Sequence, residues 1–169
     1  MLERVLTTID SISERSGHVF MWLSLALIIA ISYEVGSRYL FSSPTQWSYD
    51  LSYMLGGSLM VLGGAYTLLH EGHVRVDVIY SKLSTKGKMI LDVTLLVLFF
   101  FPLLLVLFRF SFEAAVRAFA THEVSSVGIW EPVMWPFRWV FPLGIGLTLL
   151  QGIAWFIRSV RTLRKERTP

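Results

Sequence analysis

The chain has 169 residues, of which 54% are hydrophobic and only 16% are charged. Soluble globular chains average about 25% charged residues, so this composition, with a mean hydropathy of +0.59, argues against a soluble domain. The absence of cysteine excludes disulfides, thiolate metal sites and thiol redox chemistry. A net charge of +3 is too small to indicate nucleic-acid binding until the positions of the charges are considered.

Four long segments that are nearly free of charge follow one another along the chain. A helix needs about 20 mainly apolar residues to cross the hydrocarbon layer of a membrane, and each segment is long enough. We therefore predict a single all-α integral membrane domain, residues 1–169. Its four transmembrane helices are expected at about residues 18–39, 50–70, 88–110 and 136–158. The first segment lacks a small-residue cleavage site, which indicates a permanent span rather than a signal peptide.

The lysines and arginines are distributed unevenly between the two sides of this predicted membrane domain. Eleven of the 15 lie in the N-terminal arm, in the loop between the second and third spans, or in the basic C-terminal tail, residues 159–169 with Arg158. The other side has four, which are Arg38, Arg109, Arg117 and Arg138. Cytoplasmic loops of membrane proteins carry the excess of basic residues. Both termini are therefore expected in the cytoplasm, with the protein in the inner membrane.

The N-terminal arm, residues 1–16, has its apolar residues at helical spacing and its charges elsewhere. This pattern predicts an amphipathic helix that lies in the membrane interface or along a partner protein. The alternative is a helix that simply extends the first span into the cytoplasm. Ser16 and Gly17, which precede the apolar run, favour a bend between the arm and the span.

The second span contains two glycine pairs that are seven residues apart and so lie on roughly one helix face. The four residues are Gly56, Gly57, Gly63 and Gly64. Association of helices in lipid depends on close packing, which glycine permits because it has no side chain. The pattern predicts a helix contact, either within this chain or with another subunit.

Few ionisable residues are expected inside the membrane. Glu34 and Arg38 are four residues apart and can pair on one helix face, or one of them can meet a charge on another span or subunit. The spans contain no carboxylate pair, and the second and fourth lack acidic or polar residues for a substrate path. No internal inverted repeat is evident, which argues against a self-sufficient oligomeric small transporter.

The chain also lacks the common catalytic motifs, so no enzymatic activity is expected. Its four histidines raise the alternative of a redox membrane anchor for haem or quinone, because a buried haem needs facing histidines at one membrane depth. No two histidines lie inside two spans in that way, and we expect no cofactor and no metal. Composition and pattern thus favour a subunit of a larger assembly.

Several motifs, taken in order, resemble one family. Trp47 and Asp50 fit a W-x-x-[ED] pattern, and the segment 72–78 reads G-H-V-R-V-D-V, with His73, Arg75 and Asp77. Later come Ile129-Trp130-Glu131-Pro132-Val133-Met134-Trp135 and Phe141-Pro142-Leu143-Gly144. Over residues 15–160 the chain resembles the small membrane subunit, of the DctQ type, of tripartite ATP-independent periplasmic (TRAP) transporters.

This resemblance implies a function in secondary active transport. TRAP transporters take up organic acids, such as dicarboxylates, keto acids or sialic acids, by sodium symport and with a periplasmic binding protein. A large membrane subunit of the M type carries the substrate and sodium sites, and the small permease subunit is a static scaffold that has a role in docking the binding protein. The resemblance also implies structural or interface roles for the motif residues, with Arg75 and Asp77 anchoring the cytoplasmic loop and Trp47 and Asp50 forming the helix start of the second span.

Overall fold

The computed structural model describes residues 1–70, 84–126 and 128–165, so that His73, Arg75 and Asp77 lie outside the described residues. Within those ranges, four helical segments are long and apolar enough to cross a membrane. The prediction of an all-α membrane protein with four such helices is confirmed. The described helices are α1 (Leu2–Phe20), α2 (Trp22–Leu40), α3 (Ser48–Leu62), α4 (Gly64–Leu69), α6 (Thr85–Leu95), the π-helical turn η1 (Leu96–Phe100), α7 (Phe101–Ala120) and α8 (Trp135–Lys165).

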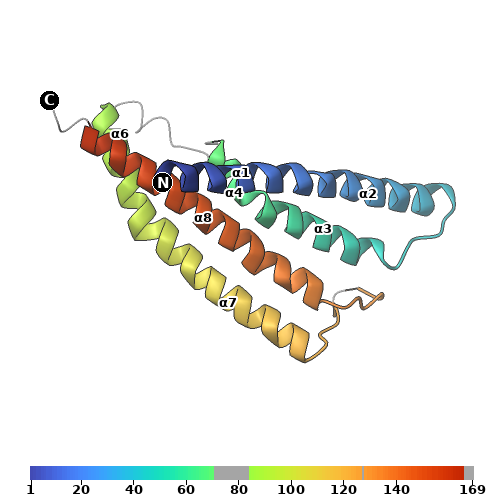
Figure 1. The fold of residues 1–169 in the computed structure, drawn as a ribbon. Coiled ribbons are helices and arrows are strands. Elements are labelled where there is room, and N and C mark those ends of the chain that lie inside the picture. Colours follow the sequence, from blue (N-terminus) through green and yellow to red (C-terminus); the bar gives the residue numbers. More distant parts are fainter. Residues whose placement is uncertain (71–83, 127, 166–169) are drawn as a thin grey trace.

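Helices α1 and α2 form one nearly straight rod (Figure 1). The only interruption is Met21, whose backbone is itself helical, with φ −58° and ψ −27°. The bend expected at Ser16 and Gly17 is wrong, because both residues lie inside α1. Gly17 serves packing instead: a Cβ atom at this position would lie 2.8 Å from Cβ of Tyr66 and would overlap its ring. The alternative of a helix that extends the first span is the one that the structure shows.

The third apolar segment is a continuous helix of α6, η1 and α7. The π-helical turn ends at Phe100, two residues before Pro102, which has no N–H group to donate to the carbonyl four residues earlier. A widened turn accommodates such a missing bond within a helix. The turn places Phe100 against Gly152 of α8, where a Cβ atom would lie 3.1 Å from Cζ of the phenyl ring.

Helix α8 occupies the centre of the fold and contacts α1, α3, α4, α6 and α7. Pro142 lies inside α8 without ending it. The start of α1 and the end of α8 lie at the same end of the bundle, as an even number of spans requires (Figure 1). At the other end, the hairpin formed by α2 and α3 diverges from the hairpin formed by α7 and α8.

Candidate functional site

The contact of α8 with α3 and α4 is built on glycine. A Cβ atom at Gly57 would lie 3.2 Å from Cζ of Phe137, and one at Gly64 would lie 2.8 Å from Oγ1 of Thr148. From the opposite side, a Cβ atom at Gly144 would lie 2.7 Å from the carbonyl oxygen of Val61. The absence of side chains at these three positions therefore lets the helix backbones approach closely, as in other membrane bundles.

The other two glycines of the predicted face have different surroundings. A Cβ atom at Gly56 would meet no described atom within 4 Å, so this residue faces away from the bundle. Gly63 separates α3 from α4, and a Cβ atom there would lie 2.9 Å from the carbonyl oxygen of Leu59. Of the four predicted residues, Gly57 and Gly64 thus make the contact, and they make it within this chain.

At the end of the bundle that holds the start of α1, a polar cluster joins α1 to α8. We call Asp10, Ser13, Gln151 and Arg158 the α1–α8 clasp. Ser13 Oγ donates a hydrogen bond to Gln151 Oε1 over 2.8 Å, and Gln151 Nε2 donates to Asp10 Oδ1 over 3.1 Å. Arg158 binds both oxygens of the same carboxylate through its two terminal nitrogens. Ser13 and Gln151 are almost fully buried, so their polar atoms depend on partners within the clasp.

Sequence reasoning missed this clasp. The expectation that the fourth span has no polar residues is wrong, because α8 buries Thr148 and Gln151. Thr148 bonds within its own helix, to the carbonyl oxygen of Gly144. Gln151 has no such local partner. A single amide in a long apolar run was the available signal, since polar groups within membrane spans almost always have a partner.

Near the other end of the bundle, Glu34 is the centre of a second polar cluster. Its Oε1 accepts hydrogen bonds from Arg38, over 3.0 Å from Nε and 2.5 Å from Nη2. Its Oε2 accepts from Thr45, over 3.0 Å from the backbone N–H, and also from the hydroxyl group. The structure therefore pairs Glu34 with Arg38 in the same helix and uses the second carboxylate oxygen to hold the connection between α2 and α3.

Trp47 and Asp50 lie where α3 begins, but neither side chain caps the helix. Trp47 precedes the first helical residue, makes no capping hydrogen bond and stacks on Tyr33, with ring centroids 5.7 Å apart. Asp50 lies in the first turn, where a negative charge suits the helix dipole. Its Oδ1 accepts a hydrogen bond of 2.6 Å from Ser125 Oγ, 75 residues later. Its Oδ2 has no hydrogen-bond partner among the described residues.

The connection between α7 and α8, residues 121–134, packs on this carboxylate. A Cβ atom at Gly128 would overlap Asp50, so the backbone of the connection lies directly against the side chain. Val124 and Val133 form an antiparallel bridge that closes the connection on itself. Glu123 accepts a hydrogen bond of 2.6 Å from Arg138 in the first turn of α8, so the connection is tied both to α3 and to α8.

Trp135 and two of the histidines make local contacts. Trp135 opens α8 and packs edge-on against Phe119, with ring centroids 5.5 Å apart. His70 Nε2 lies 2.8 Å from Glu14 Oε2, and His18 Nδ1 lies 3.6 Å from the other oxygen of the same carboxylate. Across the part of the chain that the structure describes, no group of three histidine or acidic residues has a geometry that could hold a metal ion.

Comparison with known proteins identifies the family of this membrane bundle. The family model described as "Tripartite ATP-independent periplasmic transporters, DctQ component" matches residues 27–162, which is well over half of the chain. The chain belongs to the DctQ family. The resemblance drawn from the sequence motifs is therefore confirmed.

One curated relative illustrates the DctQ match. The sialic acid TRAP transporter small permease protein SiaQ of Vibrio cholerae is 25% identical over 95 residues, which cover 56% of this chain and 51% of SiaQ. The chain thus matches about half the length of this relative. The DctQ family match includes Glu34, Asp50 and the α8 side of the α1–α8 clasp, whereas all of α1 lies before its first residue.

Proposed function

We propose that this DctQ-family chain is a non-catalytic scaffold for a large membrane subunit, in a TRAP transporter that imports an organic acid by sodium symport. The proposal rests on the observation that two polar side chains in the spans form their hydrogen bonds within this chain. Glu34 is occupied by Arg38 and Thr45, Gln151 by Ser13 and Asp10. Transporters that carry substrate themselves keep polar groups at the midplane for the substrate and coupling ion, whereas Glu34 and Gln151 are held in contacts within this chain.

The exterior of the bundle supports the same proposal. Only 6% of the most apolar window in Ile90–Ala120 is buried inside this chain, against 33% in Trp135–Leu163. The outer helices therefore offer most of their apolar surface to lipid or to another membrane subunit. The glycine contacts, the α1–α8 clasp and the cluster around Glu34 hold this bundle together. Such a bundle is suited to act as a static frame against which a large subunit moves.

The name of the SiaQ relative puts sialic acid first among the organic acids to assay. We further propose that both termini are cytoplasmic, because the basic residues are concentrated on that side of the predicted spans and the described ends of the chain lie together. The periplasmic end would then carry the connection of residues 121–134.

A three-component reconstitution tests the scaffold role. The chain, carrying an affinity tag, is co-expressed with a candidate large subunit of a TRAP transporter, purified in mild detergent and placed in proteoliposomes with a candidate binding protein. We expect the large subunit to co-purify, and labelled sialic acid to enter only with all three components and an inward sodium gradient. Sodium-driven uptake by this chain alone, or a Soret absorption band in the purified chain, would overturn the proposal.

Two variants make the assembly experiment sharper. Gly64→Leu places a side chain against Thr148 of α8, so we expect it to lower the thermal stability of the chain and the yield of the complex together. Gly56→Leu points outward and should leave the stability of the isolated chain unchanged. If Gly64→Leu assembles normally and is fully stable, the glycine contact does not hold the scaffold together.

A further inference from the structure

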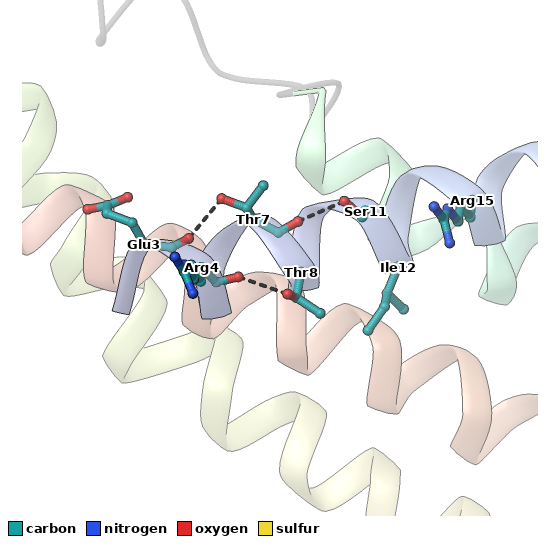
Figure 2. A pocket seen from close by; sticks show the side chains of 7 residues that line it. All are labelled: Glu3, Arg4, Thr7, Thr8, Ser11, Ile12 and Arg15. Atoms are coloured by element: carbon teal, nitrogen blue, oxygen red, sulfur yellow. Dashed lines mark hydrogen bonds between the residues drawn. The ribbon is translucent and has the colours of Figure 1, made fainter. Parts of the chain in front are cut away.

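The face of α1 that points away from the bundle forms a surface groove of about 530 Å³ (Figure 2). The described residues that line it all belong to α1, and they are Glu3, Arg4, Thr7, Thr8, Ser11, Ile12 and Arg15. This face lies opposite Leu6 and Ser13, which are buried against the rest of the bundle. The DctQ family match does not reach this helix.

The groove carries two arginines that have no acidic partner among the described side chains. Arg4 and Arg15 are 11 residues apart, which is about three helical turns, so they point in nearly the same direction. The acids beside them are engaged elsewhere, Glu3 with Arg161 and Glu14 with His70. The positive charge of the groove is therefore uncompensated within the described chain.

The hydroxyl groups of the groove are already used as donors. Thr7, Thr8 and Ser11 each donate a hydrogen bond to the carbonyl oxygen four residues earlier, over 2.8, 2.8 and 2.9 Å (Figure 2). The donors that remain for a ligand are the two guanidinium groups. Guanidinium binds phosphate and carboxylate oxygens in a bidentate manner, so the groove is suited to an anionic group.

The same face continues toward the apolar span. Trp22 follows Arg15 by seven residues, or about 10 Å along the helix, and is 66% exposed. Val19, between them, is 63% exposed. Exposed tryptophan in a membrane helix marks the level of the interface, and this residue lies near the start of the apolar run. Arg15 therefore lies within about 10 Å of the head-group level that Trp22 marks, whereas Arg4 lies about 16 Å farther along the helix.

We propose that the outward face of α1 binds the phosphate groups of anionic phospholipids, with Arg15 as the principal contact and Arg4 as a secondary one. The charge of the groove and its distance from Trp22 fit a head group, and the α1–α8 clasp holds the helix so that both arginines remain accessible. Each basic residue near an anionic membrane surface strengthens binding about fivefold. Because this attraction decays over about 8–10 Å, Arg15 contributes more than Arg4.

Native mass spectrometry of the full chain in detergent tests this proposal, with phosphatidylglycerol and phosphatidylcholine as the added lipids. Arg15→Gln should weaken phosphatidylglycerol binding about fivefold, and Arg4→Gln should weaken it less. Arg117→Gln is the matched control, since this exposed arginine has no ion pair with a described residue. It lies in the last turn of α7, and this end of α7 is at the other end of the bundle. It should leave the affinity unchanged, and phosphatidylcholine should bind equally to all variants.

Three results would overturn the proposal. The first is equal phosphatidylglycerol binding by Arg15→Gln and the unmodified chain, at equal thermal midpoints. The second is an equal loss with Arg117→Gln, which would indicate an effect of net charge alone. The third is a dimer signal that disappears in Arg15→Gln while lipid binding persists, which would assign the groove to a second copy of this chain. Retained binding in Arg15→Lys would support recognition of the charge itself.

Discussion

The α1–α8 clasp makes Gln151 the most informative single residue for the stability of this bundle. Its amide accepts a hydrogen bond from Ser13 and donates one to Asp10, and its side chain is only 2% exposed. Replacing Gln151 by leucine fills the same space with an apolar side chain of similar size and removes both hydrogen bonds. Asp10 retains Arg158, whereas the buried hydroxyl of Ser13 loses its acceptor.

The expected loss follows from these two bonds. Hydrogen bonds between membrane helices contribute about 0.6 kcal/mol on average and at most about 1.7 kcal/mol. A bond to a charged group contributes about 1.5–3 kcal/mol. Gln151→Leu should therefore lower the free energy of unfolding by about 2–4 kcal/mol. For a chain of this size, 1 kcal/mol corresponds to roughly 2–4 °C, so the thermal midpoint should fall by roughly 4–16 °C.

Thermal unfolding in detergent, followed by the loss of the monodisperse gel-filtration peak, measures this change. A double-mutant cycle with Ser13→Ala isolates the pair: the double variant should be more stable than the sum of the two single changes predicts, by about 1 kcal/mol, because neither partner is then left alone. Ser11→Ala, on the exposed face of the same helix, is the control and should shift the midpoint by less than about 1 °C. An unchanged midpoint for Gln151→Leu, or strict additivity in the cycle, would refute the clasp.

The next two predictions use the same thermal assay, and the last one uses limited proteolysis. Gly144→Ala places a Cβ atom 2.7 Å from the Val61 carbonyl oxygen and should lower the free energy of unfolding by about 1–3 kcal/mol. In the control Gly36→Ala, the new Cβ atom meets no described atom within 4 Å, so this change should be neutral or slightly stabilising. A larger loss of stability in Gly36→Ala than in Gly144→Ala would contradict the packing. Glu34→Ala removes the acceptor of Arg38 and of the Thr45 backbone N–H, so it should lower the thermal midpoint more than Arg38→Gln does. The Arg38 side chain is 56% exposed. An equal or larger effect of Arg38→Gln would contradict the central place of Glu34 in the cluster. Gly128→Ala should destabilise the connection of residues 121–134 and speed its proteolysis, because the new methyl group and the Asp50 side chain compete for one space. Adding Asp50→Ala should partly restore resistance to proteolysis. If it does not, the strain caused by Gly128→Ala lies elsewhere.

Local sequence patterns were enough to predict the spans, one ion pair and the family of this membrane protein. Four apolar segments could be predicted because crossing the hydrocarbon layer depends on the length and hydropathy of each segment by itself. The pairing of Glu34 with Arg38 could be named as one of two alternatives for the same reason: residues four apart are neighbours on any helix, so the spacing alone suggests the pair. The family could be identified for a related reason: its motifs are short and contiguous, such as Trp47 to Asp50, and a match to them needs no knowledge of packing.

Only the tertiary structure decided which partners the long-range residues meet. Gly57 and Gly64 face α8 whereas Gly56 faces outward, and this difference depends on how α3 is rotated against its neighbour. Gln151 meets Ser13, which lies 138 residues earlier, and Asp50 meets Ser125 in a connection between two other helices. The straight course of α1 was also decided by packing, because Gly17, which favoured a bend by its own conformational freedom, lies against Tyr66. Hydropathy and spacing thus determined the spans and the family, whereas helix rotation and docking, which bring distant residues together, determined the contacts that hold the bundle.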